Sequence, residues 1–183
     1  MNYPDVRQAQ MADREAVGQM WLQLLNEQAD LDDRMRVAED ALDRWMNDFP
    51  VWLEDETDRI FVAEGVEEKP VGFATARRWG PPPIYEESSE VYLDELYVQP
   101  DTRRRGYGTQ LVHAVRDWVT QVGAQRIRLR VMAANEAGRA FWEAQEAVPL
   151  SLSLTIERED AGPDDQPSDE GSKKIGFTSE RSE

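Results

Sequence analysis

A turn rich in arginine and glycine separates a β-like run from a helix-like run in the middle of this chain. The turn covers residues 99–109 and carries three consecutive arginines, followed by Gly106 and Gly108. The β-like run is 90–98, and helical apolar periodicity continues over 111–122. Glycine lets a ligand approach the backbone closely, and free amides at a helix start attract anions. The pattern therefore predicts a phosphate or pyrophosphate site between a strand and a helix.

The spacing of this turn differs from that of two common phosphate loops. A P-loop has a lysine and a serine or threonine after its last glycine, and the dinucleotide fingerprint has three glycines. Neither pattern is present. The turn instead resembles the acyl-CoA-binding motif of the GNAT superfamily of N-acetyltransferases, Gln/Arg-x-x-Gly-x-Gly/Ala, with Arg103, Gly106 and Gly108 at its fixed positions.

The resemblance implies acetyl-CoA as the acyl donor. In that family the loop amides hold the pyrophosphate, and the preceding strand pairs with the pantetheine arm. A second signature begins at Asn135 and is similar to the family's Asn-x-x-Ala-x-x-Phe-Tyr, with Ala137 taken as its alanine and Phe141 and Trp142 as its last two residues. The residues implied in cofactor binding are Leu96, Tyr97, Val98, Arg103, Arg104, Arg105, Gly106, Tyr107, Gly108, Thr109 and Asn135.

The order of predicted elements agrees with this resemblance, which covers about residues 5–157. We expect an α/β (α+β) fold, with a mixed sheet of about six to seven strands flanked by about four helices. Residues 1–157 would form the acetyltransferase domain, and 158–183 an acidic, flexible tail that is poor in apolar residues. The predicted strands are 6–9, 59–64, 71–78, 90–98, 126–132 and 148–157. Of the predicted helices, the first begins after an N-cap at Asp13, and the second covers 33–49 and ends at Pro50. The third leads from the arginine turn to a stop at Gly123, and the fourth covers 136–145.

Composition narrows the class of protein. The chain has a net charge of −16, one histidine and no cysteine. A disulfide, a thiolate nucleophile and a conventional zinc or iron site are therefore not expected, and neither are membrane or nucleic-acid binding. We expect a cytoplasmic protein whose acidic surface attracts a cationic acceptor, and the acidity also suggests a salt-adapted source.

The chemistry implied is the attack of an amine on a thioester. An alkyl ammonium has a pKa of about 10.4, so a base has to remove its proton near neutrality. Asp94 and Glu95 are the candidate bases, and the resemblance favours Asp94, which lies two residues before Leu96. Neighbouring strand residues point to opposite faces, so only one of the two faces the cleft unless the strand contains a bulge. The alternative is that both are solvated and pair with Arg128 or Arg130.

The function expected from these features is transfer of an acetyl group from acetyl-CoA to a primary amine of a small molecule or protein, by direct attack in a ternary complex. One alternative is a non-catalytic acyl-CoA-binding regulatory module, which would not need the two carboxylates. Another is a nucleic-acid-associated protein that uses residues 103–105 for phosphate contacts. A homodimer is left open.

Several other side chains bear on the site. Trp142 replaces the tyrosine that protonates the leaving sulfur in many relatives, so we expect no essential general acid, although Tyr97 or Tyr107 could reach the sulfur. His113 is expected on the surface. Trp79 and Tyr85 are candidates to border the acceptor site. Core spacing places three further tryptophans in the interior: Trp21, Trp45 and Trp118.

Overall fold

Five strands form one mixed sheet in the computed structural model, which describes residues 5–80 and 89–156. In spatial order they are β1 (Asp5–Gln8), β2 (Asp58–Glu64), β3 (Pro70–Trp79), β4 (Glu90–Val98) and β5 (Arg126–Leu129). All neighbours are antiparallel except β4 and β5. This parallel pair requires a crossover connection, which contains α3 (Tyr107–Gln121). The expected mixed fold is confirmed, with fewer strands among the described residues than expected.

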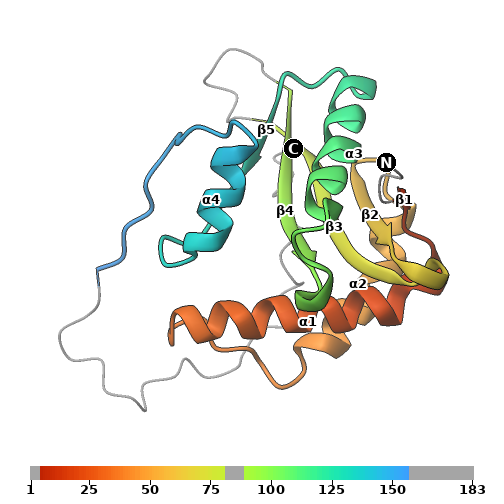
Figure 1. Ribbon diagram of the computed structural model, residues 1–183, viewed down its shortest axis with the longest axis horizontal. Helices are drawn as coiled ribbons and strands as arrows, with labels where there is room; N and C mark the ends of the chain where they lie inside the picture. Colours follow the sequence, from red (N-terminus) through yellow and green to blue (C-terminus); the bar gives the residue numbers. More distant parts are fainter. Residues whose placement is uncertain (1–4, 81–88, 157–183) are drawn as a thin grey trace, which may run out of the picture.

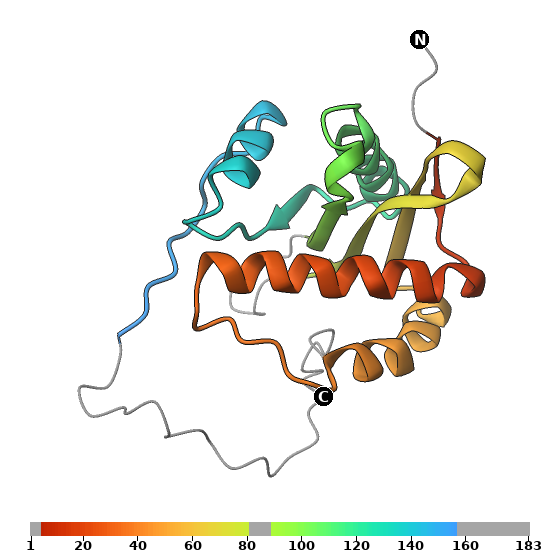
Figure 2. The ribbon, with the colours of Figure 1, turned by 60° about the horizontal axis from the view of Figure 1, so that its bottom comes forward.

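The helices form a layer on each face of the sheet (Figures 1 and 2). Helices α1 (Arg14–Leu31) and α2 (Ala41–Glu54) cover one face, and α3 lies on the other with α4 (Glu136–Ala144) beside it. The first layer has an aromatic core, and the second packs apolar side chains of α3 against small side chains of β3. The predicted burial of three tryptophans is confirmed, because Trp21, Trp45 and Trp118 are all at most 4% exposed.

Pro50 lies inside α2, so the predicted helix stop at this residue is wrong. A proline inside a helix has no N–H to donate to the carbonyl four residues earlier, here that of Met46. Arg14 of α1 supplies the missing donor, because its Nε donates to the Met46 carbonyl oxygen at 2.8 Å. The two helices are thereby joined at the point where proline would otherwise leave a carbonyl without a partner.

The first helix begins after Asp13 as predicted, but the capping at Asp13 and the start of the second helix differ from the structure. Asp13 precedes α1 as expected, but its carboxylate accepts from Arg7 and from the Gln10 amide instead of capping the helix. The second helix begins at Ala41, whereas residue 33 was predicted. The Asp32 carboxylate accepts bonds from the Arg34 amide and side chain, and local bonding of this kind competes with helix formation.

The C-terminal part of the described chain holds the largest difference. The strand predicted at 148–157 is wrong for residues 148–156, which form no ladder with the sheet. Strand β5 is also shorter than the predicted 126–132. The remaining boundaries agree closely, including β4 and the stop of α3 at Gly123, which has a φ of +68°. Residues 81–88 and the predicted tail 158–183 lie outside the described residues.

No helix in the described part of the chain combines the length and the apolar character that crossing a bilayer requires.

The contact between Arg14 and Met46 gives a testable consequence. Arg14→Met should lower the free energy of unfolding by about 1–2 kcal/mol, because a partly buried carbonyl loses its donor. In a Pro50→Ala background the alanine N–H can bond to the same carbonyl, so the same substitution should cost clearly less. Urea unfolding of the four proteins measures the difference. An equal loss in both backgrounds would contradict this account of how α2 tolerates proline.

Candidate active site

A β-bulge in β4 brings the two candidate bases to one face of the sheet. Thr75 of β3 pairs with Glu95 in the backbone ladder, and Ala76 pairs with Leu93. Asp94 therefore has no ladder partner on β3. Glu95 accepts hydrogen bonds from the Thr75 hydroxyl and, at 3.3 Å, from Nε1 of Trp21. The bulge therefore turns Glu95 toward the layer of α1 and α2.

Asp94 faces the same layer. It forms an ion pair with Nε of Arg77 at 3.2 Å, and Arg77 lies two residues after Thr75 and so on the same face of β3. From the sequence, only one of the two carboxylates was expected to face the cleft unless the strand contained a bulge. The bulge in β4 meets this exception, and both carboxylates lie on one face. The alternative pairing with Arg128 is wrong, since Arg128 and Arg126 form ion pairs with the buried Glu90 at 3.2 and 2.5 Å.

The electrostatic surroundings raise the pKa of both carboxyl groups. Burial, together with the neighbouring Glu95, raises the pKa of Asp94 to about 7, although Arg77 opposes the shift. Burial also raises the pKa of Glu95 above its usual range. Asp58 begins β2 opposite Arg77, and burial with the nearby Asp55 raises its pKa to about 6. Asp58, Asp94 and Glu95 thus all lie within the electrostatic field of the Arg77 guanidinium. Of these, Asp94 has a pKa near neutrality.

Strand β4 has a free outer edge beyond the bulge. It pairs with β5 only from Glu90 to Leu93, where β5 ends at Leu129. From Asp94 to Val98 that edge has no strand neighbour among the described residues. An exposed edge offers backbone donors and acceptors to an extended ligand. Asp94 stands where the two strands separate, and the predicted cofactor residues Leu96, Tyr97 and Val98 continue along the edge.

The arginine turn provides free amides at the start of α3. The first hydrogen bond of this helix joins the Gln110 amide to the Gly106 carbonyl. In the described part of the chain, the amides of residues 104–109 donate to no acceptor. Arg104 and Gly106 both have positive φ, 64° and 90°, a backbone form that turns successive amides toward a shared concavity. The geometry suits an anion, and Arg104 and Arg105 are exposed beside it.

Arg103 has a different environment from its two neighbours. Its guanidinium donates to both carboxylate oxygens of Glu27 at 2.7 and 2.8 Å, and its Nε donates to the Val98 carbonyl at 2.8 Å. It also lies over the ring of Tyr97, whose hydroxyl donates to Glu27 at 2.8 Å. Arg103 therefore links the turn to α1. Burial and Glu27 raise the pKa of Tyr97 to about 12, which makes this hydroxyl a weaker acid than usual.

Helix α4 closes the other side of the turn. Asn135 caps it, because its Oδ1 accepts from the Gly138 amide at 2.8 Å, and Gly138 rather than Ala137 is the third residue after Asn135. A Cβ built on Gly108 would lie 3.3 Å from the ring of Phe141, so α4 approaches the helix start closely there. The Trp142 ring packs edge-on against Phe141, with centroids 4.9 Å apart. Its place in the second core layer agrees with a packing role.

The remaining predicted residues lie apart from the bulge. His113 is exposed, as expected. Tyr107 is half-buried at the start of α3. Trp79 is half-buried at the end of β3 and lies under the guanidinium of Arg128, and Tyr85 is outside the described residues. No group of three or more histidine, cysteine or acidic side chains that could hold a metal occurs in the described ranges.

The sequence analysis missed four side chains that define the surroundings of the carboxylates. Trp21 and Thr75 bind Glu95, Arg77 binds Asp94, and Asp58 faces Arg77 across β2 and β3. One signal was available in β3, where Thr75 and Arg77 interrupt an apolar run at the period-two spacing of one sheet face. Trp21 was predicted only as core, and no periodicity reports the indole donor that it directs at Glu95.

A model of the Acetyltransferase (GNAT) family matches residues 19–146. The aminoglycoside N(6')-acetyltransferase type 1 of Stenotrophomonas maltophilia is 30% identical over 158 residues, which cover 82% of this chain and 94% of the relative.

Two solved structures share the fold. A tetramutant of the BH1408 protein from Bacillus halodurans has a TM-score of 0.77 at 19% identity, covering 84% of this chain and 99% of that one. The aminoglycoside N-acetyltransferase AAC(6')-Iy in complex with CoA has a TM-score of 0.67 at 20% identity, covering 86% and 95%. With a family match over most of its length and a bulged β4 beside the glycine turn, this chain belongs to the GNAT acetyltransferase family.

Proposed function

We propose that the chain transfers the acetyl group of acetyl-CoA to a primary amine of a polycationic small molecule, by direct attack in a ternary complex. One observation carries the proposal. The bulge in β4 puts two carboxylates of raised pKa at the point where β4 leaves β5, on the strand that leads to the free amides of residues 104–109. Family membership supports acetyl-CoA as the donor.

The cofactor roles follow from the arrangement of donors. The amides of residues 104–109 would hold the pyrophosphate, with Arg104 and Arg105 adding positive charge. The free edge of β4 from Asp94 to Val98 would pair with the amide groups of the pantetheine arm. The acetyl end would then lie toward the bulge. Arg103 would act indirectly, since its guanidinium holds Glu27 and positions the turn against α1.

Asp94 is proposed as the base. Its pKa of about 7 suits a group that accepts a proton near neutrality, and the acceptor's ammonium is the proton donor. The freed amine nitrogen attacks the thioester carbonyl carbon, the resulting tetrahedral centre collapses, and the carbon–sulfur bond breaks. The sulfur leaves as a thiolate, which takes a proton afterwards. A thiol pKa of about 8.5 makes this a tolerable leaving group without a dedicated acid, consistent with Trp142 at the position of the family's tyrosine.

The acceptor is proposed to be an aminoglycoside or a similar polyamine. Two features of the chain support this class: its net charge of −16, and the three acidic groups around Arg77 on the sheet face that α1 and α2 cover. A cation with several ammonium groups gains from such a field, and steering raises its association rate. The curated relative at 30% identity is named for aminoglycoside acetylation.

The cofactor assignment predicts a thermal shift. A hundredfold excess of acetyl-CoA over its Kd should stabilise the protein by about 2.7 kcal/mol, because it binds only the folded chain. Gly108→Val should remove most of this shift, since the new side chain meets Phe141 and screens the amides. As a control, Ala114→Val introduces valine further along α3, away from the turn, and should leave the thermal shift intact. An unchanged shift in the Gly108 variant would refute the assignment.

The base assignment predicts a pH profile. The rate should rise as pH passes about 7, because only the carboxylate form of Asp94 accepts the proton. Asp94→Asn should lower turnover by about 10²- to 10⁴-fold with acetyl-CoA affinity nearly unchanged, and higher pH should restore part of the rate. Glu95→Gln should cost much less, because glutamine can still accept from Thr75 and Trp21. The reverse order of losses would assign the base to Glu95.

The acceptor assignment predicts a preference for multiple positive charges. In a screen with thiol detection, aminoglycosides should exceed simple alkyl monoamines in kcat/KM by about tenfold or more, the equivalent of 1.4 kcal/mol. Asp58→Asn should reduce this preference, and the exposed Asp117→Asn on α3 serves as the matched control. Acetyl-CoA binding without turnover of any amine would instead favour the regulatory module. Tight, steeply salt-dependent oligonucleotide binding would favour the nucleic-acid alternative.

A further inference from the structure

The ion pair between Arg77 and Asp94 is a loose one. Only Nε of Arg77 donates to Asp94, at 3.3 and 3.2 Å to the two carboxylate oxygens. In the described part of the chain its terminal nitrogens donate to no acceptor. The pair between Arg103 and Glu27 differs, because a terminal nitrogen there lies 2.7 and 2.8 Å from the carboxylate oxygens, the usual length of a charge-assisted bond. The terminal nitrogens of Arg77 are therefore available to another carboxylate.

A second buried carboxylate lies next to Arg77 on the other side. Asp58 of β2 is the direct ladder partner of Arg77, and side chains directly opposite in a sheet have Cβ atoms about 5 Å apart. Asp58 is 8% exposed. Among the described residues its carboxylate forms no ion pair and accepts no hydrogen bond. Buried polar groups usually have a partner, so Asp58 is a group that lacks one and has a guanidinium within reach.

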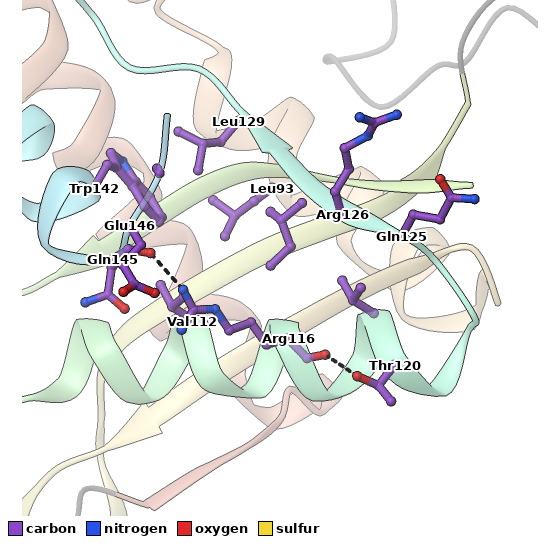
Figure 3. A pocket seen from close by; sticks show the side chains of 13 residues that line it. Leu93, Val112, Arg116, Thr120, Gln125, Arg126, Leu129, Trp142, Gln145 and Glu146 are labelled. Atoms are coloured by element: carbon purple, nitrogen blue, oxygen red, sulfur yellow. Dashed lines mark hydrogen bonds between the residues drawn. The ribbon is translucent and has the colours of Figure 1, made fainter. Parts of the chain in front are cut away.

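The arginine and both carboxylates lie on the same face of the sheet. On β4 the ladder partner of Arg77 is Tyr92, whose ring centroid lies 5.4 Å from the Arg77 Cζ atom. Leu93 faces the opposite way and lines the hollow beside α3 and α4 (Figure 3). Arg77 therefore has Asp58 on one side and Asp94 on the other. Its side chain is long enough to reach either carboxylate by rotation of its own bonds.

Binding of an acceptor supplies a reason for this rotation. To transfer its proton, an ammonium group has to come within about 3 Å of an Asp94 oxygen, and this places it beside the Arg77 guanidinium. Two positive charges so close together repel strongly in a site shielded from water. The side chains of Arg77 and Asp94 are only 18% and 13% exposed, so solvent screens this repulsion little.

We propose that Arg77 is a positioning residue with two places: it pairs with Asp94 in the free protein, and it moves to Asp58 when the acceptor's ammonium group reaches Asp94. Each charge then has a partner. The ammonium passes its proton to Asp94, and after the product leaves Arg77 returns, so that its positive charge favours release of this proton to water. The catalytic part rests on the proposed function, because it takes Asp94 as the base. The movement between the carboxylates is measurable without any acceptor.

The surrounding charges determine how the two carboxyl groups titrate. Burial is the largest cause of the raised pKa of both Asp94 and Asp58. The other charged groups that act on one or the other come from β2, β3, β4 and the end of α2: Arg59, Arg77, Glu95 and Asp55. Of these, only Arg77 acts on both carboxyl groups. Its movement from Asp94 to Asp58 should therefore raise the first pKa and lower the second.

A titration without acceptor tests the movement. Asp94→Asn imitates the protonated base, so it should release Arg77 to Asp58 and lower the Asp58 pKa by about one unit or more, measured by NMR of the carboxyl carbon. Repulsion from Asp94 also disappears in this variant. Adding Asp94→Asn to Arg77→Gln measures that part alone, and there the Asp58 pKa should fall far less. Equal falls in the two backgrounds would overturn the proposal.

A crystal structure of Asp94→Asn gives the same answer if the double variant does not fold. A terminal nitrogen of Arg77 bonded to the Asp58 carboxylate would support the movement. Arg77 still beside residue 94, with Asp58 unpaired, would contradict it.

Kinetics with kanamycin as the acceptor test the part that rests on the proposed function. Asp58→Asn leaves Arg77 without a second place, so the KM for kanamycin should rise by about tenfold while the KM for acetyl-CoA stays unchanged. In an Arg77→Gln background the same substitution should change the KM for kanamycin far less, because no guanidinium has to be displaced. Equal factors would show that Asp58 acts on the acceptor directly, which overturns the proposal. Absence of any acetylation would count against the proposed function, and the titration of Asp58 would still decide the movement of Arg77.

Discussion

One extra residue in β4 determines how the site is built. Without the bulge at Asp94, the ladder with β3 would alternate regularly, and Asp94 and Glu95 would face opposite layers. With it, both carboxylates enter the layer of α1 and α2, where β3 supplies Thr75 and Arg77. The bulge also coincides with the end of pairing between β4 and β5. The same local irregularity therefore groups the acidic side chains and opens the edge beside them.

The anion turn and the helical layer are not independent. Arg103 occupies the first fixed position of the motif, and its guanidinium donates to Glu27 of α1. Glu27 also accepts a hydrogen bond from the Tyr97 hydroxyl. Tyr97 belongs to β4, so this contact fixes the turn, the strand end and α1 relative to one another. A motif arginine can thus serve the ligand by holding the loop amides in place, while its neighbours Arg104 and Arg105 remain exposed.

Sequence patterns predicted what depends on local periodicity and missed what depends on distant partners. The limits of β4 and the stop of α3 at Gly123 follow from strand alternation and from a residue that tolerates positive φ. The passage of α2 through Pro50 depends on Arg14, which lies thirty-two positions before Met46 along the chain, and no local rule reports such a donor. The sequence pattern does not reveal the bulge either, because Asp94 and Glu95 would give the same pattern in an unbroken strand. Residues 148–156 were predicted as a strand because their apolar and polar side chains alternate, but alternation alone does not pair a segment with the sheet.

Ionisation of the buried carboxyl group of Asp94 lowers the stability of the folded chain, and binding of a cation would offset this loss. A carboxyl group with a pKa raised from 3.8 to about 7, as at Asp94, binds its proton more tightly in the folded than in the unfolded chain. Its contribution to stability is therefore greatest at acid pH and declines as pH rises from about 4 through 7. In the proposed mechanism a bound cation reverses part of this penalty, because a positive charge near Asp94 lowers its pKa. Linkage is reciprocal, so an ionised Asp94 binds the cation more tightly to the same extent. Acceptor binding and formation of the base are then one coupled event, and the acceptor with the most positive charge near the bulge prepares its own base best.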